Sequence, residues 1–140
     1  MEISMIIELI LLECKKILLE LQNNEDETNV NNCVYPPKEA IVKYQDGFSE
    51  SKPHFGKVLK TWKIGLNEIQ SLHGLNIENI KKPDGGFFQQ AIFMFSINIE
   101  KKKIIITFQP GPRCGAGSLY SISLHENEYR IYHEKYLWFF

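Results

Sequence analysis

The sequence predicts one α+β domain, residues 1–140, in which a long N-terminal helix packs on a C-terminal antiparallel sheet. Two patterns carry this prediction: an apolar periodicity of about 3.6 residues near the N-terminus, and an alternation of apolar and polar residues from Phe87 onward. Composition agrees, because a chain of 140 residues that is 44% hydrophobic and 24% charged has the make-up of one ordinary globular domain.

The stretch from Ile3 to Gln22 predicts a long amphipathic helix. Several leucines widen its apolar sector, which indicates a helix cradled by a sheet, although an oligomer interface could also use the excess. Glu8 and Glu13 interrupt the apolar run, so neither a signal peptide nor a membrane span is expected. We therefore expect a cytoplasmic protein. The apolar residues at helical spacing are Ile6, Ile7, Ile10, Cys14, Ile17, Leu18 and Leu21.

The middle of the chain carries weaker signals. Asn23 to Asn32 is polar and acidic, which predicts a surface loop. Two prolines followed by a glutamate predict a helix over residues 36–47. Residues 57–64 fit either a strand or a short helix, and an asparagine N-cap predicts a short helix over residues 67–74.

The second half of the chain predicts strands. In the first of them, Phe93, Phe95 and Ile97 share one face, with polar residues opposite. Short turns separate the segments, which therefore predict an antiparallel meander. The four predicted strands are residues 87–99, 104–109, 118–124 and 129–138.

A segment rich in glycine and proline, Gly111 to Gly117, interrupts this pattern. Its glycines permit close backbone approach, so exposed N–H groups and Arg113 could bind a carboxylate or phosphate beside Cys114 and Gly115. It is not a Walker loop, since no Gly-Lys-Ser/Thr follows, and it is not a dinucleotide fingerprint, since a strand follows it where a helix should be. The alternative is a bulged corner between two strands. Cys114 could be a nucleophile activated by a histidine later in the chain. No helix begins immediately after it, however, so a helix N-terminus does not lower the pKa of its thiol.

The last predicted strand carries histidine, glutamate and several aromatic residues. The acidic residues and His133 point to opposite faces, so no metal site is expected. Tyr129, His133 and Trp138 are candidate ligand- or partner-binding residues, because aromatic side chains with polar tips favour interfaces. A terminal strand packed into the core is the alternative, and Trp138 must dock against some surface in either case.

Charge and cysteine content exclude several classes of protein. The net charge is −1 and the basic residues are scattered, so nucleic acid is not an expected partner. Three widely spaced cysteines form neither a disulfide framework nor a zinc site and indicate a reducing compartment. No catalytic set stands out, and no cofactor is expected.

A long first helix, an irregular middle and a C-terminal meander resemble the nuclear-transport-factor-2-like (cystatin-like cone) arrangement. Gly111 to Gly117, followed by a hairpin and Tyr136-Leu137-Trp138, resembles small bacterial proteins of this type. The resemblance implies a cone-like fold whose curved sheet wraps the first helix. Some relatives are immunity proteins that neutralise polymorphic toxins.

We therefore expect a non-enzymatic binding protein whose partner is another protein, such as a toxin that it occludes. The alternative is a small-molecule-binding or enzymatic cone domain. Its pocket would lie between helix and sheet, with polar groups from Arg113 and from His133 or Tyr129. A homodimer is compatible with either function.

Overall fold

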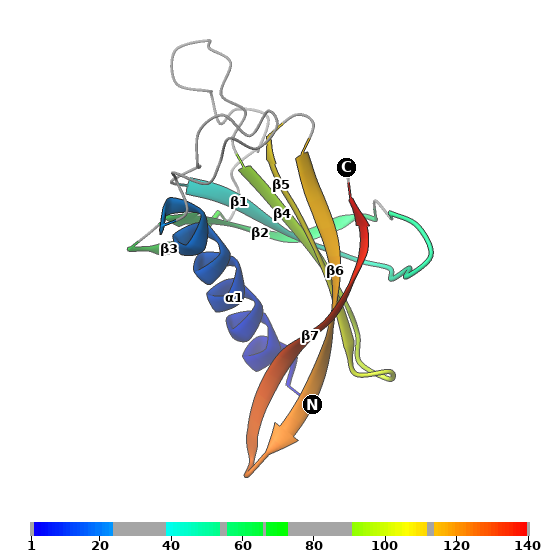
Figure 1. Cartoon of the computed structure of the whole chain (residues 1–140). Coiled ribbons are helices and arrows are strands. Elements are labelled where there is room, and N and C mark those ends of the chain that lie inside the picture. The colour runs from blue at the N-terminus through cyan, green and yellow to red at the C-terminus, as the bar shows by residue number, and fades with distance from the viewer. Residues whose placement is uncertain are drawn as a thin grey trace, which may run out of the picture.

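The computed structural model of the chain describes residues 2–23, 39–53, 56–65, 67–72, 91–111 and 114–139. Within these residues, one helix packs on one seven-stranded sheet of strand order β3-β2-β1-β4-β5-β6-β7. The predicted fold class, α+β with the N-terminal helix on a curved sheet, is confirmed (Figure 1). The elements are α1 (Ile3–Asn23), β1 (Glu39–Gln45), β2 (Val58–Gly65), β3 (Ile69–Ser71), β4 (Ala91–Asn98), β5 (Lys103–Gly111), β6 (Cys114–His125) and β7 (Glu128–Phe139).

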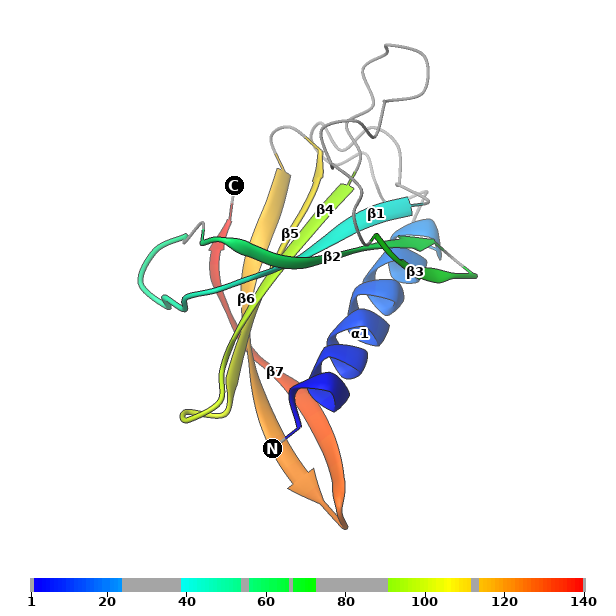
Figure 2. The same ribbon diagram turned by 180° about the vertical axis from the view of Figure 1, so that it is seen from behind.

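Helix α1 lies along the concave side of the sheet, as Figures 1 and 2 show from opposite directions. Every fourth residue from Ile6 to Leu18 is fully buried, which confirms the predicted apolar face. Leu12 and Leu19 are exposed, so the widest part of that face is not covered by the described sheet. The core between the two layers contains Ile6, Ile10, Leu11, Cys14, Leu18, Ala40, Val42, Trp62, Ile64, Ala91, Phe93, Phe95, Ile104, Ile106, Tyr120 and Ile122.

The four C-terminal strands form the predicted meander. Strands β4 to β7 pair antiparallel with their sequence neighbours. Of the β4 residues that were expected to face inward, Phe93 and Phe95 are buried and Ile97 is partly buried against the core. Strand β6 begins at Cys114, so Gly115 and Gly117 lie in a strand, and the β5–β6 pairing has a register shift between Phe108 and Gly111. Most of the predicted polar loop, residues 24–32, lies outside the described residues.

The helix predicted over residues 36–47 is wrong, because residues 39–45 form strand β1. This strand pairs antiparallel with β2 and parallel with β4, which makes the sheet mixed rather than wholly antiparallel. Consecutive residues from Ala40 to Val42 are buried, so both faces of β1 are covered at these positions. Tertiary pairing therefore overrides the local helix-start signal.

The sequence of residues 57–64 fitted either a strand or a short helix, and the structure shows strand β2 there, over Val58–Gly65. The short helix predicted from Asn67 is wrong, since Ile69–Ser71 pairs with β2 as the edge strand β3. The two edges of the sheet formed by the described strands are thus β3, with three residues, and β7, with twelve. The described strands do not close into a barrel, because β3 and β7 end the strand order on opposite sides.

Candidate functional site

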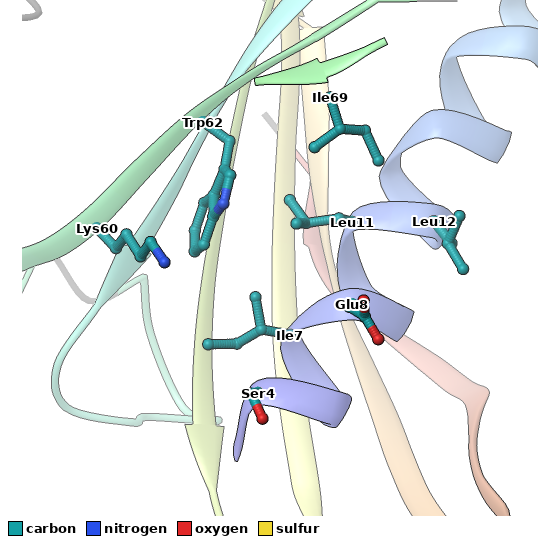
Figure 3. Close-up of a pocket in the computed structure, with 8 residues that line it drawn as sticks. All are labelled: Ser4, Ile7, Glu8, Leu11, Leu12, Lys60, Trp62 and Ile69. Atoms are coloured by element: carbon teal, nitrogen blue, oxygen red, sulfur yellow. The ribbon is translucent and has the colours of Figure 1, made fainter. Parts of the chain in front are cut away.

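A groove of about 530 Å³ runs between α1 and the β2–β3 end of the sheet (Figure 3). Its volume falls in the range of roughly 300–1,000 Å³ that is typical of ligand pockets. Of the eight described residues that line it, five are apolar. The lining consists of Ser4, Ile7, Glu8, Leu11, Leu12, Lys60, Trp62 and Ile69.

The helix wall of the groove is one stripe of α1. Residues 4, 7, 8 and 11 are three and four positions apart, so they share one face of the helix. Leu11 is buried at the floor, whereas Leu12 is 56% exposed at the rim. Helical spacing thus places one leucine in the core and its neighbour where a bound molecule would cover it.

The sheet wall is built around Trp62. Its ring lies 5.9 Å from that of Phe95, so the indole is anchored in the core while it also lines the groove. Lys60, two residues earlier, projects to the same side of β2, and its Nζ lies 5.2 Å from the centre of the Trp62 ring. A cation over an indole face is attracted to the ring quadrupole, which holds the ammonium group at the rim.

The charges of the groove come from opposite walls. Glu8 projects from α1 and Lys60 from β2 (Figure 3). Neither forms a salt bridge with another described residue, so both remain open to a bound molecule. The groove can therefore bind an apolar group flanked by polar or charged groups of either sign.

The predicted binding residues whose side chains the structure describes do not all lie on one face of the sheet. Arg113 lies outside the described residues, and of Cys114 only the backbone at the start of β6 is described. Tyr129 packs against the core on the helix side of β7. Trp138 lies across Gly117, whose register with β5 places it on the other face of the sheet. The candidate residues thus divide between two faces.

His133 belongs to a cluster of rings on β6 and β7. Its ring meets Tyr120 edge-on at 5.3 Å and lies 4.7 Å from Tyr136. The hydroxyl of Tyr120 in turn donates a hydrogen bond of 3.2 Å to Oε1 of Glu13 on α1. The helix, β6 and β7 are therefore joined by one series of polar and aromatic contacts.

Two groups near Glu13, the Tyr120 hydroxyl and the Cys14 thiol, have raised pKa values and therefore favour their neutral forms. Burial raises the pKa of the Tyr120 hydroxyl well above its ordinary value of 10.0, and the negative charge of Glu13 adds to the effect. Burial likewise raises the pKa of the Cys14 thiol, again with Glu13 contributing. Cys14 is fully buried, as its apolar helical setting predicts, and a thiol in this environment is inert rather than nucleophilic.

We expect stability to fall more steeply above pH 10 in the native protein than in a Tyr120→Phe variant. An unfolded tyrosine ionises near pH 10, whereas folded Tyr120 retains its proton, so the unfolded state gains stability as pH rises past that value. Urea unfolding between pH 8 and 11 measures the two slopes. Other tyrosines contribute equally to both proteins, and equal slopes would contradict the assignment to Tyr120.

The groove contains residues that the sequence did not single out. Lys60 and Trp62 lie in the segment that fitted either a strand or a helix, so their shared face was not predictable. The one available signal was the excess of apolar residues on the first helix, which indicated a second contact surface. Leu12, at the groove rim, is part of that excess.

Comparisons of the chain with known proteins found no protein in which a related groove has been described. No family model matches the chain, and no curated protein or solved structure matches it. Within the described ranges, no three histidine, cysteine, aspartate or glutamate side chains converge as metal ligands would. In the same ranges, α1 is too polar to qualify as a bilayer-spanning helix.

Proposed function

We propose that the protein is a non-enzymatic binding protein that receives an amphipathic helix of a partner protein along α1 and its groove. The observation that carries this proposal is a line of exposed apolar residues beside the groove. Met5, Leu12 and Leu19 are seven residues apart, so they follow one side of α1, and all three are exposed. An exposed apolar patch of this kind is typical of an interaction surface.

The length of this line favours a macromolecule over a small ligand. From Met5 to Leu19 the helix rises about 21 Å at 1.5 Å per residue. A partner helix with apolar side chains on one face matches that length, and helix-in-groove recognition uses this spacing. Glu8 and Lys60 at the rim would select side chains of opposite charge on the partner helix, and these ion pairs would fix the register of that helix.

The resemblance noted above supports a specific partner class, a toxin domain that the protein occludes in the cytoplasm. Co-expression with the product of a neighbouring gene tests this proposal, because an immunity protein must restore growth. Protection is the expected result. Growth arrest by the linked toxin in the presence of the folded protein would exclude the immunity role.

A pair of leucine variants tests the groove itself. Leu12→Asp buries a carboxylate beneath the partner and should weaken binding at least about 30-fold, which corresponds to about 2 kcal/mol. Leu124→Asp is the matched control, because Leu124 is 59% exposed, against 56% for Leu12, but lies at the end of β6. Titration calorimetry with the purified partner measures both. Equal affinities of the two variants would exclude the groove as the binding surface.

The volume of the groove supports a second candidate function, binding or transformation of a small molecule. A thermal-shift screen of amphipathic small molecules distinguishes it from the first, because a ligand at about 100 times its Kd stabilises the folded state by about 2.7 kcal/mol. Lys60→Ala should reduce such a shift, whereas Lys101→Ala, in the exposed turn between β4 and β5, should leave it unchanged. A shift that is identical in both variants would place the ligand elsewhere.

A further inference from the structure

Strand β7 is a long edge strand, and its outer edge has no neighbour among the described strands. It has twelve residues, whereas the opposite sheet edge, β3, has three. An edge strand presents unpaired N–H and C=O groups, and natural proteins usually shield such an edge by shortness, bulges or charge. Strand β3 is short, so it needs no further protection. The question is whether the side chains of β7 block a second strand or select one.

The face of β7 that points away from α1 carries charges of both signs around an exposed tyrosine. Ile131 packs toward the core, so its neighbours Arg130 and Tyr132 project to the other face. Glu134 shares that face, where it forms an ion pair with Lys103 of β5. Tyr132 is 49% exposed. Glu128 lies two residues before Arg130 on the same face, and its carboxylate is 4.0 Å from the Arg130 guanidinium. In sequence order the face therefore presents an anion, a cation, a tyrosine and an anion.

Two-fold symmetry restricts how this strand can pair with a copy of itself. In an antiparallel pair the axis passes between directly opposite residues, so one residue must lie opposite its own copy. With Tyr132 on the axis, Arg130 of each chain lies opposite Glu134 of the other, which gives two pairs of opposite charge. Opposite charges across strands stabilise the pairing, whereas like charges destabilise it.

Neighbouring registers lack this complementarity. An axis at Arg130 or at Glu134 places two like charges opposite each other, and an axis at Ile131 places Glu128 opposite Glu134. An axis at Tyr129 pairs Glu128 with Arg130, but the turn at residues 126–127 leaves almost no overlap. A bulge at Glu134, which has no directly opposite residue on β6, sets the far limit of regular pairing.

We propose that two copies of this chain associate through antiparallel pairing of their β7 edges, with Tyr132 on the two-fold axis and Arg130 opposite Glu134 of the second copy. The dimer extends the sheet across both protomers. It leaves the groove open, since the groove lies at the β2–β3 end of the strand order. The association is therefore independent of the function proposed above, and Leu12→Asp should remain dimeric.

Charge reversal tests the proposed pairs. Sedimentation velocity should give a dimer for the native protein and a monomer of half that mass for Arg130→Glu, in which each new glutamate faces Glu134 of the other copy. The double variant R130E/E134K should restore the dimer. Lys101→Glu, in the exposed β4–β5 turn, is the control and should stay dimeric. A monomeric native protein, or an Arg130→Glu variant that remains dimeric, would overturn the proposal.

A cysteine placed on the axis tests the register without reversing any charge. Opposite residues of antiparallel strands have Cα atoms about 4.5–5.5 Å apart, within the range that a disulfide spans. Tyr132→Cys should therefore form a covalent dimer on mild oxidation. In Arg130→Cys the two introduced thiols would be about 13 Å apart, four residues along the strand, and should not link. The native protein controls for its own cysteines, and preferential linking at position 130 would overturn the register.

Discussion

Replacement of Phe95 by alanine is expected to lower the free energy of unfolding by about 3–5 kcal/mol. Phe95 is fully buried in the middle of β4. Its ring stacks on Tyr44 of β1 at 4.9 Å and on Trp62 of β2 at 5.9 Å, so three strands meet at one side chain. Truncation removes the buried ring and leaves a cavity that rigid neighbours on a sheet can close only in part.

Phe139→Ala is the matched control, because it removes the same ring from a position that is 71% exposed. Its effect should stay within about 0.5 kcal/mol, as for other exposed positions. Urea unfolding followed by far-ultraviolet circular dichroism measures both variants. Similar losses for the two phenylalanines would show that the β4 centre is not the core of the molecule.

The same stack connects the core to the groove. Trp62 contacts Phe95 on one side and lines the groove on the other. Its position is therefore fixed by packing rather than by surface contacts, which is what a binding surface requires if it is to be preorganised. Loss of Phe95 would release that constraint. A partner should then bind the surviving folded molecules less tightly.

The elements with strong periodicity were predictable from the sequence. Helix α1 and the strands β4 to β7 each carry enough repeats of one period to identify them, and local periodicity needs no knowledge of distant residues. The errors lie where the pattern is short. Strand β1 has consecutive apolar residues because it is buried on both faces. Such a run shows neither the period of two residues of a half-buried strand nor the period of 3.6 residues of a helix. Strand β3 has three residues and exists only because β2 is beside it.

The candidate site was less predictable than the fold, for a physical reason. The groove joins residues about fifty positions apart, such as Leu12 and Trp62, and nothing local in either segment encodes that meeting. The surplus of apolar residues on α1 did indicate that some surface remained to be covered. By contrast, Tyr129 and Trp138 were grouped as aromatic neighbours, although they are nine positions apart and strand alternation directs residues an odd number apart to opposite faces of the sheet. A bulge between them has a different effect, because it brings His133 and Tyr136, three positions apart, into contact without a clear sign in the sequence.

Replacement of Gly117 by alanine is expected to destabilise the fold by about 2–3 kcal/mol, because the indole of Trp138 occupies the space that a side chain would need. A Cβ atom at position 117 would lie 2.3 Å from both Cε2 and Nε1 of Trp138. The ring would have to leave its place across β6, and overpacking of this kind costs about 1–3 kcal/mol in addition to the lost contacts. This close approach also explains how a residue near the end of β7 is docked.

A double-mutant cycle separates this steric conflict from a general intolerance of position 117. In a Trp138→Ala background the obstacle is absent, and alanine in a strand is normally favoured over glycine by roughly 0.5–1 kcal/mol. Gly117→Ala should therefore be neutral or stabilising there, which gives a coupling energy of at least about 2 kcal/mol between the two positions. Urea unfolding of the four proteins measures it. An equal cost of Gly117→Ala in both backgrounds would mean that the indole does not lie over Gly117, and the docking of the last strand would have to be assigned to other contacts.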